Sequence, residues 1–411
     1  MQVLMTIDIQ KIREDFPILA TEINGKPLVY LDNAATTQKP QAVIDAVTHY
    51  YTTYNSNIHR GTHHLSNLAT EAHEGARKTV QNYIHAAHDH EIIFTRGTTE
   101  AINLVAFAFG EAFVRAGDEV IVTELDHHSN FVPWQMMCER RQAHFRVVSF
   151  DSNGDLKLDI FKKLLSDRTR IVAFNHVSNS LGTINPAREM IQLAHDAGAA
   201  VLVDAAQAVQ HIEHDVQALD ADFYAFSGHK IYAPTGIGVL YGKEKWLDAM
   251  PPYQGGGEMI DHVSIEKTTY NKLPFKFEAG TPNIVGPIGL AAAIDYLNGF
   301  SFDEIRAHED ALLAYGREQL LSIDGLKLYS NAKRRASILA FNVEGIHHYD
   351  LGTLLDTQGI AVRTGHHCTE PIMTALGIEG TVRASLALYN TRSEIDALVA
   401  GIQKVCKMLG K

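Results

Sequence analysis

The chain has 411 residues, 45% of them hydrophobic and 20% charged, which is typical of a globular protein long enough for two domains. Its net charge of -12 argues against nucleic acid or an acidic membrane surface as the main partner, but it leaves room for a small anionic ligand in a local basic pocket. The three cysteines, Cys138, Cys368 and Cys406, are too few and too scattered for a disulfide framework or a CxxC metal site. We see no signal peptide and no apolar run of about 20 residues, so we expect a cytoplasmic protein.

In the first 300 residues, short β-branched runs alternate with amphipathic segments. The runs lie at 118–130, 145–150, 169–179 and 199–209, and a helical pattern at 186–199 ends near a glycine. This alternation predicts an α/β fold with a mostly parallel sheet between helices. Polar residues collect just after the runs, at the carboxyl edge where such sheets bind ligands.

From about residue 300 the pattern changes to α+β, which predicts a second, smaller domain. We expect helices at 303–322, 350–359 and 392–409, with strand-like runs at 337–345 and 382–389. The expected organisation is an N-terminal segment at 1–30 packing with the small domain, a large domain at 31–299, and a small C-terminal domain at 300–411 that carries the loop of Cys368.

The first candidate motif is a Gly-Thr-Thr turn that opens a helix within TRGTTEAINLVA, residues 95–106. Thr98 and Thr99 present hydroxyls and unpaired N–H groups to an anion, and Glu100 suits the positive end of the helix dipole. Such turns are also common as plain helix caps. The turn becomes a candidate phosphate site only beside the motifs below, with Ser227 and His229 as further donors.

The second motif is the pair of histidines in ELDHHSN, residues 124–130, directly after a predicted strand. Adjacent histidines more often form a polar loop than a site, and their side chains diverge, so we expect no shared metal. The sharper interpretation has His127 stacked on a planar cofactor and able to move protons.

Asp204 and Lys230 form the third candidate. Asp204 ends an apolar run three residues before Gln207, and Lys230 lies among small, aromatic and apolar neighbours in SGHKIYAPTG, residues 227–236. Asp204 could simply cap a helix, and Lys230 could be an ordinary surface lysine. Together they fit a pyridoxal phosphate site, in which an acid pairs with the ring nitrogen and a desolvated lysine holds the aldehyde.

The last motif places Cys368 in a polar stretch, VRTGHHCTEP, residues 362–371. The thiolate is the reactive form of cysteine, and Arg363, His366 and His367 could supply the positive charge that favours it. Arg383, on the next predicted strand, has the planar fork that binds a carboxylate. Zinc held by Cys368 and the histidines is the weaker alternative, since no second cysteine lies nearby.

These motifs together resemble the class V aminotransferase family of pyridoxal phosphate enzymes, and within it the group II, SufS-type cysteine desulfurases. The resemblance runs through nearly the whole chain, including LVYLDNAATTQKP at 28–40, NIHRGTHHLS at 57–66, FEAGTPN at 277–283 and RASLALYNT at 383–391. It implies fold type I of the pyridoxal-phosphate-dependent transferases, with a seven-stranded-type sheet in the large domain. Cys368 is followed by Thr369 and Glu370, where the family pattern leads us to expect a small apolar residue first.

The resemblance also implies roles for individual residues. Lys230 would hold the cofactor aldehyde, Asp204 would pair with the ring nitrogen, Gln207 would bond the phenolic oxygen, and His127 would stack on the ring. The phosphate would be held by Thr98, Thr99, Ser227 and His229, together with Thr281 from the other subunit of a homodimer with shared sites. The substrate carboxylate would be bound by Arg383, Asn179 and Arg363. Cys368 would take sulfur from L-cysteine as a persulfide, leaving L-alanine.

The short interval between Cys368 and Arg383 implies, by the same resemblance, a SufE-type sulfur acceptor and a place in iron–sulfur cluster assembly. A selenocysteine lyase would use the same groups, so cleavage of L-selenocysteine is expected as well. An ordinary aminotransferase needs no catalytic cysteine. A non-enzymatic sulfur carrier would be expected to have lost Lys230, Asp204 or Cys368, and all three are present.

Overall fold

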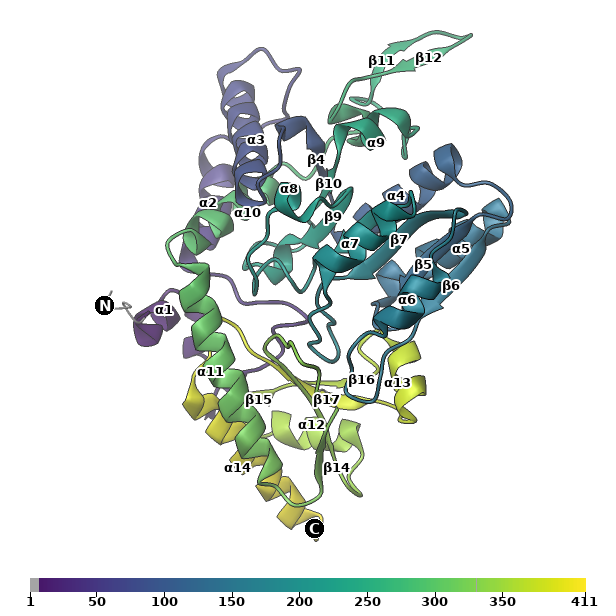
Figure 1. The fold of residues 1–411 in the computed structure, drawn as a ribbon. Helices are drawn as coiled ribbons and strands as arrows, with labels where there is room; N and C mark the ends of the chain where they lie inside the picture. The colour runs from purple at the N-terminus through teal and green to yellow at the C-terminus, as the bar shows by residue number, and fades with distance from the viewer. Residues whose placement is uncertain (1–6, 330) are drawn as a thin grey trace, which may run out of the picture.

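The computed structural model describes residues 7–329 and 331–411, which fold into two adjoining parts (Figure 1). The larger part is built on a seven-stranded sheet in the order β4-β10-β9-β8-β7-β5-β6. Its strands are β4 (Ile92–Thr95), β5 (Glu119–Thr123), β6 (His144–Val148), β7 (Thr169–Asn175), β8 (Ala200–Asp204), β9 (Phe223–Ser227) and β10 (Gly238–Gly242).

The sheet is mostly parallel, as the sequence predicts. Neighbouring strands from β6 through β5, β7 and β8 to β9 pair in parallel. Strand β10 runs antiparallel to both β9 and β4. The carboxyl ends of β5, β7, β8 and β9 therefore meet at one edge of the sheet, where the polar residues after the predicted strands are brought together.

Both faces of this sheet are covered, which explains why its strands are apolar throughout. Along β8, Val201 and Val203 face one hydrophobic cluster, and Ala200 and Leu202 face the other. Helix α7 contributes to the first cluster, and α4 and α5 to the second. The helices of this part are α2 (Gln41–Thr53), α3 (His64–Tyr83), α4 (Thr98–Phe113), α5 (Val132–Arg141), α6 (Leu158–Leu164), α7 (Ala187–Asp196), α8 (Val216–Leu219), α9 (Glu244–Ala249) and α10 (Val285–Leu297).

The smaller part, green to yellow in Figure 1, contains an antiparallel sheet in the order β13-β14-β17-β16. Its strands are β13 (Leu326–Leu328), β14 (Ile338–Val343), β16 (Arg363–Gly365) and β17 (Thr381–Ser385), and its helices are α11 (Phe302–Leu321), α12 (His348–Asp356), α13 (Glu370–Leu376) and α14 (Arg392–Met408). These elements enclose a hydrophobic cluster of their own. The helices and strands predicted after residue 300 are present at the expected places.

The N-terminal segment contacts both parts. It contains α1 (Ile9–Glu14), the small ladder of β1 (Glu22–Ile23) with β2 (Lys26–Pro27), and β3 (Val29–Tyr30), which pairs in parallel with β15 (Ile360–Ala361). Arg13 forms an ion pair with Glu394 on α14. The Phe16 ring also packs on Tyr296, at the end of α10. The domain boundaries near residues 30 and 300 stay a prediction.

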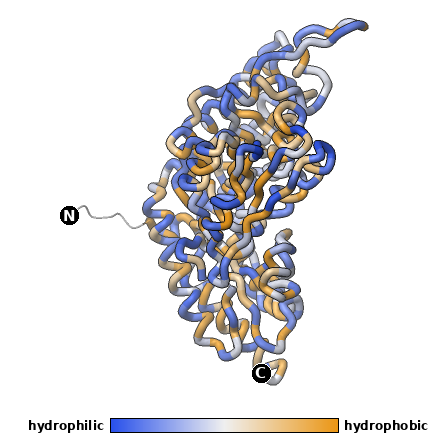
Figure 2. Tube along the Cα trace, turned by 45° about the vertical axis from the view of Figure 1, so that its right-hand side comes forward, coloured by the Kyte–Doolittle hydropathy of each residue, from blue (hydrophilic) through white to orange (hydrophobic). Residues whose placement is uncertain are grey.

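A hairpin of β11 (Ile260–Val263) and β12 (Thr268–Tyr270) projects from the larger part, at the top of Figure 1. Hydrophobic stretches of the trace run through the middle of both parts in Figure 2. Among the described helices, none combines the length and the apolar character needed to cross a membrane.

Candidate active site

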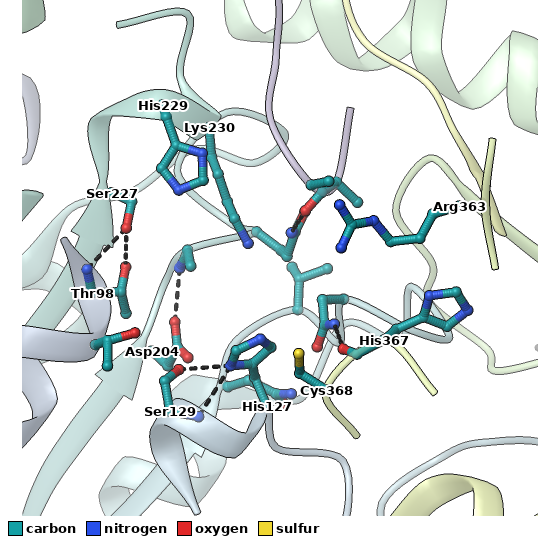
Figure 3. A pocket seen from close by; sticks show the side chains of 18 of the residues that line it. Thr98, His127, Ser129, Asp204, Ser227, His229, Lys230, Arg363, His367 and Cys368 are labelled. Atoms are coloured by element: carbon teal, nitrogen blue, oxygen red, sulfur yellow. Dashed lines mark hydrogen bonds between the residues drawn. The ribbon is translucent and has the colours of Figure 1, made fainter. Parts of the chain in front are cut away.

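One cavity of about 260 Å³ lies at the carboxyl edge of the large sheet, next to the smaller part (Figure 3). Among its lining residues are Thr98, Thr99, His127, Asn179, Asp204, Gln207, Ser227, His229, Lys230, Arg363, Cys368 and Arg383. The structure thus brings together all the site residues predicted from the sequence except Thr281. Thr281 is exposed and lies beside other cavities, with Arg96 and Asn283 in one and with His59 and Arg60 in another.

The turn between β4 and α4 forms one end of the cavity. The backbone N–H and the hydroxyl of Thr98 both lie 2.8 Å from Ser227 Oγ at the end of β9. The close packing of this turn on β10 requires a glycine, because a Cβ added at Gly238 would lie 2.4 Å from the Cα of Gly97. Hydroxyls and the N-terminus of α4 therefore converge at one point, as an anion-binding turn requires.

His127 lies in the loop after β5, and the buried carboxylate of Asp126 fixes this loop by hydrogen bonds. Asp126 accepts hydrogen bonds from Thr123 N and Oγ1, Asn130 Nδ2 and Asn175 N, at 2.6 to 2.9 Å. His127 Nδ1 accepts a hydrogen bond from Ser129 N at 3.0 Å. Burial, and next the charge of Lys230, lowers the pKa of His127 to about 3. The imidazole is therefore neutral at physiological pH.

Asp204 ends β8 and Gln207 lies in the turn that follows, and they are 4% and 2% exposed. Asp204 Oδ1 accepts a hydrogen bond from Ala206 N at 2.9 Å, so the capping interpretation is partly right, although a turn rather than a helix follows. Burial raises the pKa of Asp204. Gln207 donates Nε2 to Ala34 O, while its Oε1 has no hydrogen-bond partner in the described part of the chain.

Lys230 ends the short turn η4 (Gly228–Lys230), and its amine points into the cavity (Figure 3). Burial lowers the pKa of this amine to about 8, with the charge of Asp204 acting in the opposite sense. The neutral amine is thus accessible near physiological pH, as a nucleophilic or basic lysine requires.

Cys368 lies in the turn between β16 and α13, on the opposite side of the cavity from Lys230 (Figure 3). Its φ of 57° and the φ of 54° at His367 are left-handed, a costly backbone conformation for residues other than glycine. Hydrogen bonds fix the turn: Cys368 N donates to His366 Nδ1, Cys368 O accepts from His128 N, and Glu370 N donates to His128 Nε2.

His367 does not play the part that the sequence suggested. It is buried, its Nε2 lies 2.9 Å from Thr381 Oγ1, and burial, followed by the charge of Arg383, lowers its pKa to about 2. It therefore supplies no positive charge to Cys368 at neutral pH.

In residues 7–329 and 331–411, no group of three or more His, Cys, Asp or Glu side chains is placed to hold a metal ion.

The two predicted arginines lie at the same end of the cavity as Cys368. Arg383 is 2% exposed and donates Nη1 to Asn179 O at 2.8 Å, and Asn179 in turn donates Nδ2 to His367 O at 2.8 Å. Arg383 Nε and Asn179 Oδ1 are buried and have no partner among the described residues. Arg363 is more exposed. Both guanidinium groups also contact Asp32, which the sequence analysis did not single out.

The residues of the cavity fit pyridoxal phosphate, the cofactor that the resemblance implies. A buried carboxylate, a half-buried lysine and an anion-binding turn match its ring nitrogen, aldehyde and phosphate. The unpartnered Gln207 Oε1 is a further indication, because a buried polar atom left without a hydrogen bond costs about 1–3 kcal/mol. A polar ligand in the cavity would remove that cost.

Sequence comparison relates the whole chain to one group of proteins. The family model described as aminotransferase class-V matches residues 29–398. A cysteine desulfurase of Synechococcus elongatus is 52% identical over 398 residues, which make up 97% of this chain, and the chain spans 64% of that relative's length. A cysteine desulfurase of Salmonella agona is 52% identical over 407 residues, with 99% of this chain and 100% of the relative covered.

Solved structures give the same result. The cysteine desulfurase CsdA from Escherichia coli, in its S-sulfonic acid form, is 40% identical with a TM-score of 0.91, covering 98% of this chain and 99% of its own. The apo cysteine desulfurase from Thermococcus onnurineus is 40% identical with a TM-score of 0.92, covering 99% of this chain and 100% of its own. The predicted α/β fold, fold type I of the pyridoxal-phosphate-dependent transferases, is confirmed.

Proposed function

The chain belongs to the class V aminotransferase family, and from that premise we propose that it is a cysteine desulfurase, which converts L-cysteine to L-alanine and keeps the sulfur as a persulfide on Cys368. The observation that carries the proposal is that the thiol of Cys368 and the amine of Lys230 line the same cavity. One reactive group of each kind is what this sulfur transfer needs.

In this proposal the cavity binds pyridoxal phosphate at the large sheet. Asp204 pairs with the ring nitrogen, Gln207 bonds the phenolic oxygen and His127 packs on the ring. Thr98, Thr99, Ser227 and His229 hold the phosphate. When bound, the cofactor stabilises the electron pair released at the α-carbon of an amino acid.

The remaining residues act on the substrate. Arg383, Asn179 and Arg363 bind the α-carboxylate, which uses the unpaired Arg383 Nε. The neutral amine of Lys230 removes the proton from the α-carbon. His127, neutral at physiological pH, can accept or donate a proton at Nε2, since its Nδ1 is held by Ser129.

Sulfur transfer is then a displacement at the substrate sulfur. The Cys368 thiolate attacks this atom, a sulfur–sulfur bond forms, and the bond between the substrate sulfur and its β-carbon breaks. The electron pair of the broken bond stays with carbon, which takes up a proton and becomes the methyl group of L-alanine. Cys368 is left as the persulfide, so one cysteine and one thiol give one alanine and one persulfide.

The test is to incubate the protein loaded with pyridoxal phosphate with L-cysteine, quantify alanine, and map the persulfide by mass spectrometry of peptides. We expect equal amounts of alanine and persulfide in the first turnover, with the persulfide on Cys368. Lys230→Ala should form no alanine. Cys368→Ala should bind the cofactor normally but accumulate no persulfide, whereas the matched control Cys138→Ala should behave as the unsubstituted protein. Sulfide release by Cys368→Ala at the normal rate would contradict the role of Cys368.

We further propose a cytoplasmic homodimer in which Thr281 of the partner subunit completes the phosphate site. The support is that Thr281 is exposed and lies outside the cavity of its own chain. Light scattering should give twice the chain mass. Thr281→Val should weaken binding of pyridoxal phosphate, although the residue does not line its own chain's cavity.

The proposed acceptor of the persulfide sulfur is a SufE-type protein that passes it to iron–sulfur cluster assembly. Cleavage of L-selenocysteine is proposed as well, because the same base, arginines and thiol would act on it. Adding a SufE-type protein should raise alanine formation under multiple turnover. Assays with both amino acids should give alanine from each.

A further inference from the structure

Asp32 lies between the two arginines of the cavity. Its Oδ1 is 3.2 Å from Arg383 Nη2, and its Oδ2 is 3.3 Å from Arg363 Nε. The residue follows β3 and does not itself line the cavity. Its carboxylate therefore contacts the guanidinium groups of Arg363 and Arg383, which line the cavity, without lining the cavity itself.

Within residues 7–329 and 331–411, the Asp32 side chain is held only by these two contacts. Its only hydrogen bonds in the described part of the chain are those to the arginines. The backbone of the segment is fixed separately: Asp32 O accepts hydrogen bonds from Ala35 N and Thr36 N, and a bridge joins Asp32 to Ser385. A neutral side chain at this position would leave those backbone contacts in place.

The three charged side chains in contact here, Arg363, Arg383 and Asp32, form a cluster with one surplus positive charge. Arg363 and Arg383 carry two positive charges, and Asp32 carries one negative charge. His367 is neutral, because burial lowers its pKa to about 2. One carboxylate of a ligand therefore balances this cluster, and a second anionic group on the same ligand would find no unbalanced arginine in it.

We propose that Asp32 is a specificity-determining residue: as an internal counter-ion it restricts the arginine pair to amino acids with a single carboxylate and disfavours those with an anionic side chain. The inference rests on the proposed function, in which the arginines bind the α-carboxylate. Asp32 acts through the arginines and touches no reacting atom, so it is a positioning residue.

Without Asp32, the surplus becomes two positive charges. The buried Arg383 also loses a compensating charge: burial already lowers its pKa to about 10, and Asp32 opposes that effect. An anionic side chain would then gain a partner in the exposed Arg363. The change should therefore favour a dicarboxylate more than a monocarboxylate, which mere loosening of the arginines would not do.

The test measures dissociation constants of L-aspartate and L-alanine by calorimetry on pyridoxal-phosphate-loaded protein. We expect Asp32→Asn to lower the ratio of the aspartate constant to the alanine constant about tenfold, and Asp32→Ser to do the same if Asp32→Asn does not fold. Asp32→Glu keeps the charge and should keep the ratio within twofold. The matched control Asp118→Asn, which removes an aspartate–arginine pair with Arg170 at the start of β5, should also keep it.

An unchanged ratio in Asp32→Asn, or an equal rise of both constants, would overturn the inference, because either would assign Asp32 a purely structural role. Conversion of L-cysteine is assayed separately on the same preparations. Unsubstituted protein that forms no alanine would contradict the proposed function, and the binding ratio would still decide the role of Asp32.

Discussion

Replacing Thr37 with valine should loosen the turn that carries Lys230. The Thr37 hydroxyl is buried, donates to His229 O at 3.2 Å, and accepts the backbone N–H of Tyr232 at 2.8 Å, so it bridges both sides of η4. His229 O accepts three further hydrogen bonds, from Thr37 N, Thr36 Oγ1 and Lys39 Nζ. The N–H of Tyr232 has no other acceptor among the described residues.

The free-energy cost differs between the two partners of the Thr37 hydroxyl, because Tyr232 N has one acceptor whereas His229 O has four donors. Valine keeps the shape of threonine but leaves the buried N–H of Tyr232 without a partner, which costs about 1–3 kcal/mol. Local opening of the turn should therefore become about 5- to 150-fold more frequent. Thr36→Val is the matched control. It removes one of four donors to His229 O and leaves no buried group without a hydrogen bond, so it should lower the free energy of opening the turn by well under about 1 kcal/mol.

The assay is amide hydrogen exchange of the cofactor-loaded protein, read by mass spectrometry on peptides that cover residues 228–235. Thr37→Val should speed exchange in these peptides and leave those of the distant helix α14 unchanged. Equal acceleration by Thr36→Val, or no acceleration by Thr37→Val, would refute the reasoning, because it would show that the bond between Tyr232 N and the Thr37 hydroxyl does not hold the turn.

Three further outcomes are expected. Gly238→Ala places a Cβ 2.4 Å from Gly97 Cα and should weaken binding of pyridoxal phosphate at least tenfold by calorimetry, while Gly255→Ala, with nothing within 4 Å of the added Cβ, should not. The His127 imidazole, with its pKa lowered to about 3, should contribute no inflection to the rate of alanine formation between pH 5 and pH 9, so His127→Asn should lower that rate without changing its pH dependence. Burial would raise the pKa of Asp222, but hydrogen bonds from neighbouring histidine and tryptophan rings lower it to about 2. The stability that this carboxylate provides is thus present above its unfolded pKa and is lost as the pH falls through 2. In urea unfolding, Asp222→Asn should lower the free energy of unfolding by about 2 kcal/mol at pH 7, and by progressively less as the pH falls below about 4.

The residues of the cavity could be predicted because ligand-binding residues in parallel sheets lie at the carboxyl ends of the strands. His127, Asp204 and Lys230 come soon after apolar runs, and parallel neighbouring strands carry the loops that follow them to one edge. Their residue types then narrow the chemistry to an acid, an imidazole and an amine. The second half of the site, at Arg383 and Cys368, required the resemblance, because nothing in a single sequence says that a small sheet folds against that edge.

Other parts of the site could not be predicted because they depend on contacts distant in sequence. Asp32 meets Arg383 across 351 positions, and its motif was noted only as part of the resemblance. Asp126 reads as a loop residue, yet its carboxylate collects four hydrogen bonds beneath His127. A carboxylate just after a buried strand is the signal that could have found Asp126, whereas the short strand β3 before Asp32 is only half-buried. The neutrality of His367 depends on its burial, which the polar surrounding sequence hides.

The alignment of the two reactive groups depends on backbone contacts between the two parts of the molecule. Lys230 belongs to the large sheet, whereas Cys368 belongs to a turn of the smaller part. That turn is held to the loops after β5 and β7 through Cys368 O on His128 N and His367 O on Asn179 Nδ2. Both bonds use backbone carbonyls of left-handed residues, so the unusual turn itself aims these carbonyls at the large part. The left-handed conformation, which costs about 1–3 kcal/mol per residue, therefore places Cys368 against the cavity. If the turn relaxed, the thiol would remain present but would no longer face Lys230.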